Sequence, residues 1–470
     1  LRLGTAELEA HKPEAARASL SRSARVAIRS GNTTVAAEAL ARRMWIVADP
    51  LGQPEVGLAD ADVAGGFVDG QHELPRLRWL FHNNHGVALF RSGDVPAAER
   101  AYRDALSVLE GNRDTYPVEF ISTGYNLATL LATSARPAAA AQELGQVREQ
   151  AVGLLGVEHP RVAVITVELA LTLGDIGRRD QALAKLDDSF ALLGPADTYL
   201  RSSHHTAYAN LSLYTRDYAE AYRHAEAAVS IMAEFPSHQH KIQARALKSL
   251  TGISFGGVDM EAGLRELRAA AREVEATFGR DHEGAGHAHW WLGRGLRAAG
   301  RIEDAIGEFA RANEIYGSLG SGASALVGLH GMELAEAHLA RGDFPQAGVA
   351  LGVVMKAQDT AGLGDQNVYR LALQKLRGDL ALAQNDSLAA AREFAETCPA
   401  MAANRDEDDP DLAQCRLSWS QSLGPTREGR KLANQARAAF KSLGAGFASE
   451  RLEAERLLRD VATQAPSSEN

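Results

Sequence analysis

Apolar and small residues recur along the chain with a helical spacing that itself repeats every 41 to 43 residues. In the clearest unit, Phe81 and Val87 fall near one face of a first helix. Ala98, Tyr102 and Ala105 follow at i, i+4 and i+7, which is one face of a second helix. Each unit is therefore predicted to be a pair of amphipathic helices.

A short polar turn separates the two helices of this unit. Gly93 can leave the first helix in a left-handed conformation, and Asp94 can cap the second helix. The same pattern, spanning 86–105, returns over 293–312 and over 335–354. A fixed period of this length indicates stacked supersecondary units rather than one globular core. We predict an all-α fold, a right-handed α-solenoid of about eleven stacked helical hairpins.

Each unit carries a small residue, or its replacement, seven positions before the turn. These positions are predicted at Gly4, Trp45, Gly86, Ala128, Ala170, Ser212, Leu250, Gly293, Ala335, Gly378 and Leu417. Two units fit poorly. Near Trp45 the second helix is predicted to be broken by Pro50, Pro54 and Gly57. Near Ser212 the turn comes about three residues early, which leaves the register there open.

The quality of the repeats divides the chain into four predicted parts. We expect degenerate repeats over 1–77, a central solenoid over 78–397, a C-terminal capping hairpin over 398–460 and a disordered tail over 461–470. The chain starts at Leu1, already in repeat register, so we expect an N-terminal part of a longer protein to be missing.

Charge and cysteine content narrow the class of protein. The formal net charge of -10 argues against a nucleic-acid partner, which needs clustered Lys and Arg. Cys398 and Cys415 are the only cysteines, so a disulfide framework and a structural zinc site are not expected. This usage favours a reducing, cytoplasmic compartment. No apolar run approaches the roughly 20 residues that span a bilayer, so no membrane partner is expected.

Several short motifs resemble a known family. The run Asn83-Asn84-His85-Gly86, the run Tyr125-Asn126-Leu127-Ala128 and the loop over 155–163 resemble the 42-residue tetratricopeptide repeat of kinesin light chains. The whole chain also resembles the C-terminal repeat region of bacterial serine/threonine protein kinases of the myxobacterial kind. The segment 415–440 is similar to the last hairpin of those proteins.

The catalytic motifs of such kinases are absent from this sequence. It has no glycine-rich nucleotide loop followed by a Val-Ala-x-Lys strand, no His-Arg-Asp loop and no Asp-Phe-Gly. We therefore predict that this chain is not an enzyme and needs no cofactor. The resemblance implies that it is the non-catalytic arm of a kinase.

Histidine is the residue type that most invites a metal hypothesis. His282, His287 and His289 lie close together, but His282 and His287 are five residues apart and cannot share a helix face. We expect a loop and a helix start there, and no metal site. Histidines near inter-repeat loops are expected to be solvated, namely His204, His205, His238 and His240.

The resemblance places the first helices on the concave surface, with the positions one to three residues before the small position facing or flanking it. The partner-binding residues that it implies are Asn83, Asn84, Tyr125, Asn126, Trp290, Trp291, Arg294 and Arg297. Amides can hold a peptide backbone, and aromatic and arginine side chains anchor interfaces. Packing between helices is an equal alternative for Trp291 and Tyr125, and a neighbouring turn is one for Asn84.

These observations favour a protein–protein interaction scaffold that binds a peptide or partner domain on its concave face. In a kinase this arm would recruit substrates or regulate the catalytic domain. Two alternatives stay open. The chain could be the effector-sensing arm of a signal-responsive ATPase or transcription regulator, or a scaffold that self-associates through an exposed helix face.

Overall fold

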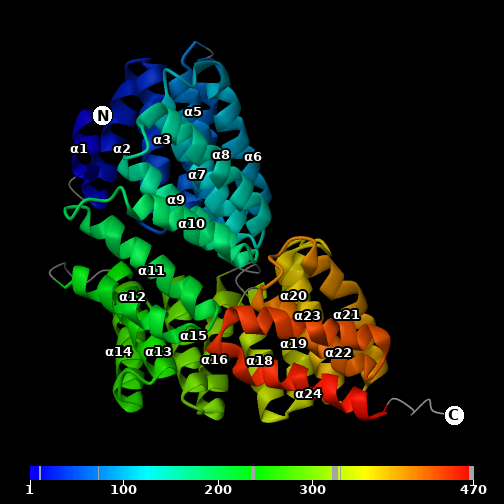
Figure 1. Cartoon of the computed structure of the whole chain (residues 1–470). Helices are drawn as coiled ribbons and strands as arrows, with labels where there is room; N and C mark the ends of the chain where they lie inside the picture. Colours follow the sequence, from blue (N-terminus) through cyan, green and yellow to red (C-terminus); the bar gives the residue numbers. More distant parts are fainter. Residues whose placement is uncertain (10–11, 72, 234–238, 320–326, 329, 465–470) are drawn as a thin grey trace. The chain divides into compact units, whose positions relative to one another are not determined.

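The computed structural model describes residues 1–9, 12–71, 73–233, 239–319, 327–328 and 330–464 (Figure 1). The elements in this part of the chain are α-helices and two short 3-10 helices. Contacts divide the chain into two compact units. Unit 1 comprises Leu1–Ser134 and Ala139–Ile165, and unit 2 comprises Ala135–Ala138 and Thr166–Asn470. The division therefore falls near the start of α8 and within α9, and each unit is described by itself.

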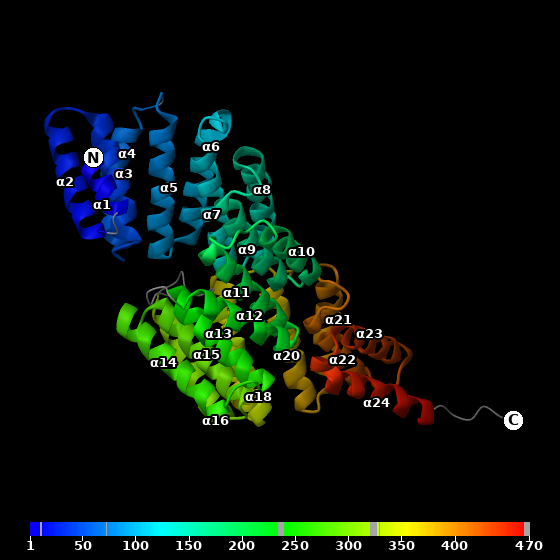
Figure 2. The ribbon, with the colours of Figure 1, turned by 60° about the vertical axis from the view of Figure 1, so that its left-hand side comes forward.

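Unit 1 contains the first helices of the chain, which succeed one another as antiparallel hairpins (Figure 2). Their bounds are α1 Arg2–Glu9, α2 Pro13–Arg29, α3 Thr33–Ala48, α4 Pro54–Val68, α5 Pro75–Ser92, α6 Val95–Leu109, η1 Glu110–Asn112, α7 Pro117–Thr133 and α8 Pro137–Leu155. The next helix, α9 Pro160–Asp175, starts in unit 1 and belongs to unit 2 after Ile165. The first helices α3, α5 and α7 also contact one another in sequence order. This is the packing of a helical-repeat stack.

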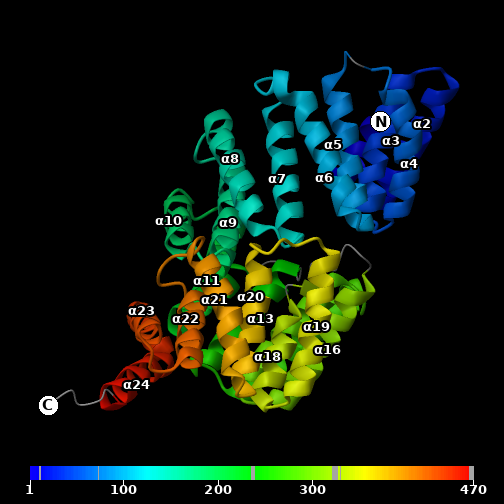
Figure 3. The same cartoon turned by 90° about the vertical axis from the view of Figure 1, so that its right-hand side faces the viewer.

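Unit 2 continues the same pattern (Figure 3). Its helices are α10 Arg179–Phe190, α11 Thr198–Tyr214, α12 Tyr218–Ile231, α13 Gln239–Phe255, α14 Met260–Phe278, α15 Glu283–Ala298, α16 Ile302–Ser318, α18 Met332–Arg341, α19 Phe344–Thr360, α20 Val368–Ala383, α21 Ser387–Ala402, α22 Pro410–Leu423, α23 Arg427–Leu443, η3 Ala445–Phe447 and α24 Ala448–Gln464. The prediction of an all-α, tetratricopeptide-like solenoid is confirmed.

The turns within hairpins have the predicted geometry. Gly93 has φ +88° and Gly342 has φ +83°, values that only glycine adopts readily. Asp94 and Asp343 follow them, and each side chain accepts a hydrogen bond from a backbone N–H in the first turn of the next helix. These two residues end one helix and start the next, which fixes the hairpin length and hence the repeat period.

The small position of the repeat has a direct packing reason. A Cβ atom at Gly86 would lie 2.7 Å from the ring of Tyr102, and one at Gly293 would lie 2.6 Å from the ring of Phe309. Gly378 and Phe394 repeat this arrangement at 2.6 Å. The aromatic ring of each second helix thus packs directly on the backbone of its first helix, and all three rings are fully buried.

The two poor repeats are regular in the structure. α4 is continuous from Pro54 to Val68 because Pro54 occupies its first turn, where no backbone N–H is needed. The predicted break there is wrong. In the other poor repeat the left-handed residue is Arg216, with φ +53°, and Ala209 lies seven positions before it. The small position is therefore Ala209, three residues before the predicted Ser212.

Cys398 of α21 and Cys415 of α22 form a disulfide, with their Cα atoms 5.8 Å apart. The sequence analysis expected no disulfide framework, and this single disulfide corrects the expectation of a chain without such cross-links. The 17-residue separation in sequence places them on facing sides of two adjacent helices, which cysteine spacing alone does not reveal. Both residues are buried. A cytoplasmic location stays a prediction.

Two further expectations concern the division of the chain into four parts and the absence of a membrane-spanning segment. The four-part division of the chain stays a prediction, although α24 continues to Gln464 and so covers the start of the tail predicted over 461–470. The rest of that tail lies outside the described residues. No helix in the described parts of the chain combines the length and the apolar character needed to cross a bilayer.

Candidate functional site

The three asparagines predicted to bind a partner lie in unit 1 and share one hydrogen-bond network. Asn84 Nδ2 donates to the backbone oxygen of Ala41 on α3 at 2.9 Å, and Asn83 Nδ2 donates to Asn84 Oδ1 at 3.0 Å. On α7, Thr123 Oγ1 and Asn126 Nδ2 donate to Asn83 Oδ1 at 2.9 and 3.1 Å. We call this set the amide network.

The amide network is mostly shielded from solvent. Asn83 and Asn84 are each 7% exposed and Thr123 is fully buried, whereas Asn126 is half-buried. The network joins the first helices of three successive repeats. The side-chain amides of Asn83 and Asn84 therefore already make hydrogen bonds within the fold. Partner binding by Asn83, Asn84 and Asn126 stays a prediction. Tyr125, next to Asn126, is half-buried.

Trp290, Trp291, Arg294 and Arg297 lie together on α15 in unit 2. Trp291 is half-buried against the core cluster of α13–α16, in line with the packing alternative. The Arg294 guanidinium carbon lies 4.8 Å from the centre of the Trp290 ring, a cation–π contact. The indole N–H of Trp290 is buried and has no hydrogen-bond partner among the described residues.

The two arginines meet carboxylates of the next first helix. Arg297 Nη1 lies 2.5 Å from Glu333 Oε2 and 2.9 Å from Glu336 Oε2, both on α18. Arg294 Nε lies 3.6 Å from Glu333 Oε1. On the following first helix, α20, Lys375 Nζ pairs with Asp379 Oδ2 at 2.9 Å. Glu336 and Asp411 both act on the charge of Lys375.

These six residues of α15, α18 and α20 form the charged ladder, which comprises Arg294, Arg297, Glu333, Glu336, Lys375 and Asp379. Its side chains reach solvent, and that of Glu336 is 49% exposed. The surrounding protein nevertheless shifts the pKa of two of these side chains. Burial, followed by the like charge of Glu333, raises the pKa of Glu336 above its usual range. Burial also lowers the pKa of Arg294, which the charge of Glu333 opposes.

Four members of the ladder were missed by the sequence analysis, although the repeat period contains a signal for them. Arg294, Glu336 and Asp379 each lie one residue after a small position, at Gly293, Ala335 and Gly378. Alignment of the repeats on these positions would have placed the three charges on successive first helices. The pattern of a single unit does not contain this information, because the three charges belong to three different units.

A second set of charges in unit 2 is acidic and without partners. Glu168 and Asp175 lie seven residues apart on α9, and among the described residues neither carboxylate has an ion pair or a side-chain hydrogen bond. The protein packed around Asp175, then the like charge of Glu168, raises the pKa of Asp175 to about 7, against the opposing charge of Arg405, although part of the residue stays exposed to solvent. Asp175 in turn raises the pKa of Tyr369 on α20, after burial. We call Glu168 and Asp175 the acidic pair.

The three histidines considered for a metal site, His282, His287 and His289, have different structural roles. His282 caps α15 by accepting a hydrogen bond from the backbone N–H of Gly284 at 3.0 Å. His289 pairs with Glu308 and Glu275 at 2.6 and 3.3 Å. His287 packs against the rings of Tyr316 and His330. Among the described residues, no group of three potential ligands has the geometry of a metal site.

The expectation of solvated histidines is wrong for one of the pairs. His204 is fully buried, and its ring nitrogens contact the Leu200 backbone oxygen and the Ser189 hydroxyl. His205 contacts the ring of His224 at 2.8 Å between their Nδ1 atoms. His238 lies outside the described residues.

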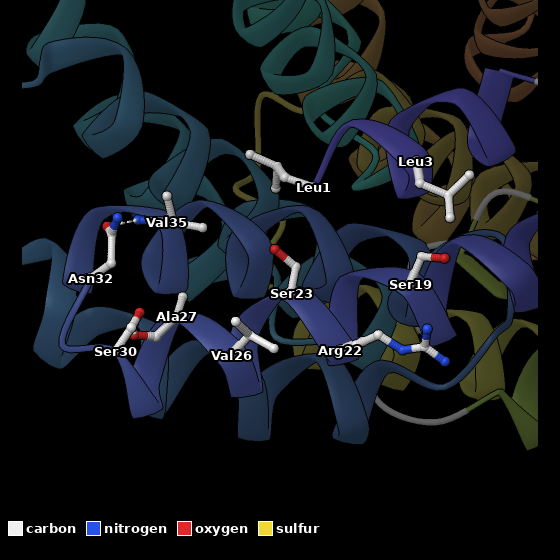
Figure 4. Close-up of a pocket in the computed structure, with 10 residues that line it drawn as sticks. All are labelled: Leu1, Leu3, Ser19, Arg22, Ser23, Val26, Ala27, Ser30, Asn32 and Val35. Carbon is white, nitrogen blue, oxygen red and sulfur yellow. Dashed lines mark hydrogen bonds between the residues drawn. The ribbon is translucent and has the colours of Figure 1, made fainter.

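Two surface grooves contain fewer charged side chains than the charged ladder. In unit 1, a groove of about 430 Å³ lies between α1, α2 and the start of α3, where Leu1, Arg22 and Val26 line it (Figure 4). In unit 2, a groove of about 340 Å³ runs between α19 and α21 over α20. An exposed pair, Arg377 and Glu393, lies at its edge with 2.9 Å between the charged atoms.

Comparisons with known proteins concern the fold. No protein-family model and no curated protein matches the chain. Solved structures that resemble it include a Rap protein complexed with competence and sporulation factor, at 13% identity over 83% of this chain and 97% of that one, with a TM-score of 0.48. The human IFIT1 dimer with PPP-AAAA resembles it at 14% identity, over 92% of this chain and 91% of that one, with a TM-score of 0.45.

Another solved structure resembles a shorter part of the chain. A putative kinesin light chain from Podosopora anserina, with nearly identical TPR-like repeats, is 18% identical over 42% of this chain and 93% of that one, with a TM-score of 0.32. At these identities the likeness concerns the fold alone, which is a stack of tetratricopeptide-like helical hairpins.

Proposed function

We propose that this chain is a protein–protein interaction scaffold that captures an extended segment of a partner on the charged ladder of unit 2. The observation that carries the proposal is the ladder itself. Three successive first helices present charges of both signs, and part of each of these side chains stays accessible to solvent, from 16% of Lys375 to 49% of Glu336. Surface ion pairs contribute little to stability, so stability alone gives a weak reason for such an arrangement.

The charges without partners suggest the chemistry of the partner. The ladder's cations are paired, because Arg294, Arg297 and Lys375 each contact a carboxylate. The acidic pair, Glu168 and Asp175, has no cation of its own in the described part of unit 2. A segment with a lysine or arginine side chain would supply the missing charge, while its backbone could exchange hydrogen bonds with the ladder.

The resemblance to bacterial serine/threonine kinases gives the proposal a setting. In that setting the chain is the substrate-recruiting or regulatory arm of a kinase whose catalytic domain lies elsewhere in the protein. The arm would act by raising the local concentration of a bound substrate near that domain. Sequencing the gene on both sides of the present chain, followed by a search for the His-Arg-Asp loop, tests this part independently.

Peptide selection on the full chain tests the proposed binding. The immobilised chain is panned against a library of unstructured peptides, and selected peptides are titrated by fluorescence anisotropy. We expect enrichment of lysine and arginine. The variant Glu336→Gln/Asp175→Asn should weaken binding about tenfold or more, which corresponds to about 1.4 kcal/mol. The matched control, Arg377→Ala/Glu393→Ala, alters an exposed pair at the α19–α21 groove and should bind as the natural chain does.

Three outcomes would contradict the proposal. The first is equal affinity of the ladder variant and the natural chain. The second is an equal loss of affinity in the control variant. The third is tighter binding of a single-stranded oligonucleotide, titrated in parallel, because the proposal assigns the site to a protein segment.

A further inference from the structure

The turn between α9 and α10 contacts a loop that lies far away in the sequence but within the same unit. The backbone N–H of Asp406, between α21 and α22, donates to the oxygen of Gly177 at 3.1 Å. A Cβ atom at Gly177 would lie 2.7 Å from both Arg405 Cγ and Asp409 Oδ2. Gly177 therefore provides the left-handed turn, with φ +78°, and also the space that the loop occupies.

The turn of the next repeat contacts the same loop. The Tyr214 hydroxyl lies 2.8 Å from Asp409 Oδ2 and 3.0 Å from Asp411 Oδ2, and it accepts a hydrogen bond from Arg405 Nη1 at 3.0 Å. Arg405 also pairs with Asp409 at 2.9 Å. The side chains of Arg405 and Asp409 are 5% and 1% exposed. Tyr214 and Gly177 thus hold one buried ionic group between them.

Arg216, two residues after Tyr214, contacts the C-terminal end of the chain. Its Nη1 atom lies 2.6 Å from Glu450 Oε1 on α24, and its guanidinium carbon lies 4.4 Å from the centre of the Phe447 ring. A Cβ atom at Gly446 would lie 2.6 Å from the Arg216 backbone oxygen. These residues bring α24 against the turn between α11 and α12.

The backbone of Arg216 adopts a conformation that does not suit its residue type. Its φ of +53° is left-handed, whereas glycine occupies the equivalent place in the turns at Gly93, Gly177 and Gly342. A non-glycine residue in such a conformation costs on the order of 1 kcal/mol and persists where the surrounding structure requires its side chain. In Arg216 the side chain makes the contacts to α24, which is a physical reason to keep it.

The contacts between these turns and the C-terminal helices are made mainly by polar side chains, with Phe447 under the Arg216 guanidinium as the apolar exception. The hydrophobic cores on the two sides are separate. The core of α22–α24, around Phe440, shares no residue with the core of α11–α13, around Leu213. In a helical-repeat protein each hairpin is stabilised by its neighbours along the chain. Separation of these contacts would therefore hydrate charged groups while the core of α11–α13, which contains no residue of α24, stays closed.

We propose that α24, together with the loop between α21 and α22, is a separable latch that docks on the turns at Gly177 and Arg216 and opens while the hairpins of unit 2 stay folded. The latch contacts are those of Gly177, Tyr214 and Arg216 with the 405–411 loop and with 446–450. Asp411 connects the latch to the charged ladder, since it faces Tyr214 and also acts on Lys375. The latch itself does not depend on the proposed function.

Hydrogen exchange of the full chain, measured by mass spectrometry without any partner, tests the latch. Arg216→Gly removes the contacts to Glu450 and Phe447, yet glycine fits the left-handed turn better than arginine. We expect amide exchange in α24 to become at least about tenfold faster, while exchange in α11 and α12 stays the same or slows. The variant should therefore open the latch without unfolding the hairpin that carries it.

Two further variants complete this experiment. Asn385→Gly, the matched control, replaces another left-handed residue, with φ +63°, in the turn between α20 and α21 and should leave α24 exchange unchanged. The reversed pair Arg216→Glu/Glu450→Arg should restore part of the protection of α24. Unchanged exchange of α24 in Arg216→Gly would show that these contacts do not hold the latch. Faster exchange throughout unit 2 would show that it is not separable, and either result overturns the proposal.

Discussion

Unit 1 and unit 2 place different polar groups at the same repeat position. Two residues before the small position, unit 1 has Asn84 and Asn126, whereas unit 2 has Trp291 and Glu333. The amides both donate and accept, so most of their polar atoms can be satisfied inside the stack of first helices. Glu333 can only accept, and it meets the arginines of a neighbouring helix at the solvent-accessible face.

This difference indicates that the amide network of unit 1 and the charged ladder of unit 2 serve different purposes. The amide network joins three repeats through buried hydrogen bonds, and it leaves few free groups for a ligand. The charged ladder keeps part of each charged side chain accessible to solvent, where a partner can replace one ion pair by another at modest cost. We therefore expect substitutions in unit 1 to affect stability and substitutions in unit 2 to affect binding.

Reduction of the disulfide should have the largest effect and should be confined to unit 2. Cys398 and Cys415 close a loop of 17 residues, for which chain entropy predicts about 3 kcal/mol of stabilisation. Hydrogen exchange with and without a reductant would show faster exchange in α21 and α22 only. Unit 1 contains no cysteine and serves as the internal control. Equal exchange of α21 and α22 in both conditions would contradict this prediction.

Asn83→Ala should destabilise unit 1 by about 2 kcal/mol, because buried hydrogen-bonding groups lose their partner. The substitution removes the acceptor for Thr123 Oγ1 and Asn126 Nδ2 and the donor for Asn84 Oδ1. Urea unfolding followed by hydrogen exchange would measure the loss in α5 and α7. Asn434→Ala, at an exposed amide of α23, should have little effect. A loss no larger than that of this control would refute a structural role for the network.

Glu336→Gln should change the stability of unit 2 by less than about 1 kcal/mol, since exposed ion pairs contribute little. Its side chain is 49% exposed, and Arg297 keeps Glu333 as a second partner. The same urea experiment applies, and peptide binding measured on the same sample should fall. If Glu336→Gln destabilises unit 2 as much as Asn83→Ala destabilises unit 1, the two polar sets play the same structural role and the comparison fails.

The smallest expected effect is a pH dependence from Asp175. A raised carboxyl pKa means that the folded state holds the proton more tightly than the unfolded chain. The associated stability is present at pH values below the ordinary carboxyl pKa of 3.8 and is lost as the pH rises through about 7. Glu168, Tyr369 and Arg405 are the charged or titratable groups that act on it. Solvent at this exposed side chain reduces the effect.

Urea midpoints of unit 2 between about pH 4 and pH 8 would measure this dependence. The natural chain should become less stable with rising pH over that range, and Asp175→Asn should show a flatter profile. The matched control, Asp386→Asn, alters an exposed helix-capping carboxylate of α21 and should keep the natural slope. Identical slopes for the natural chain and Asp175→Asn would contradict the assignment to Asp175.

The sequence predicted the repeated hairpin well because its signals are local. Gly93 and Asp94 specify a turn through backbone geometry and capping, and the structure confirms both. The glycine at position 86 signals that an aromatic ring packs on the helix, as Tyr102 does. Where another residue type takes the left-handed turn, as at Arg216, the local signal is lost and the predicted register moved by three residues.

The surroundings of the predicted binding residues could not be predicted from sequence, because they depend on neighbouring repeats. Asn84 was expected on an open surface, but the backbone oxygen of Ala41 lies within hydrogen-bond distance on the adjacent first helix. Arg297 was predicted without its partners, which come from α18 about 40 residues later. A repeat alignment could have found Glu336, since it occupies the position of Arg294 one unit on.

By itself the sequence determined the helical hairpin, its period and the absence of kinase catalytic motifs, because each depends on residues a few positions apart. Only the tertiary structure decided which polar groups are buried, that Cys398 meets Cys415, and that Arg216 and Tyr214 contact segments about 200 residues later. Stacking brings such residues together through the accumulated rotation of many repeats. Pairings of that kind follow from the curvature of the whole unit, which no local pattern encodes.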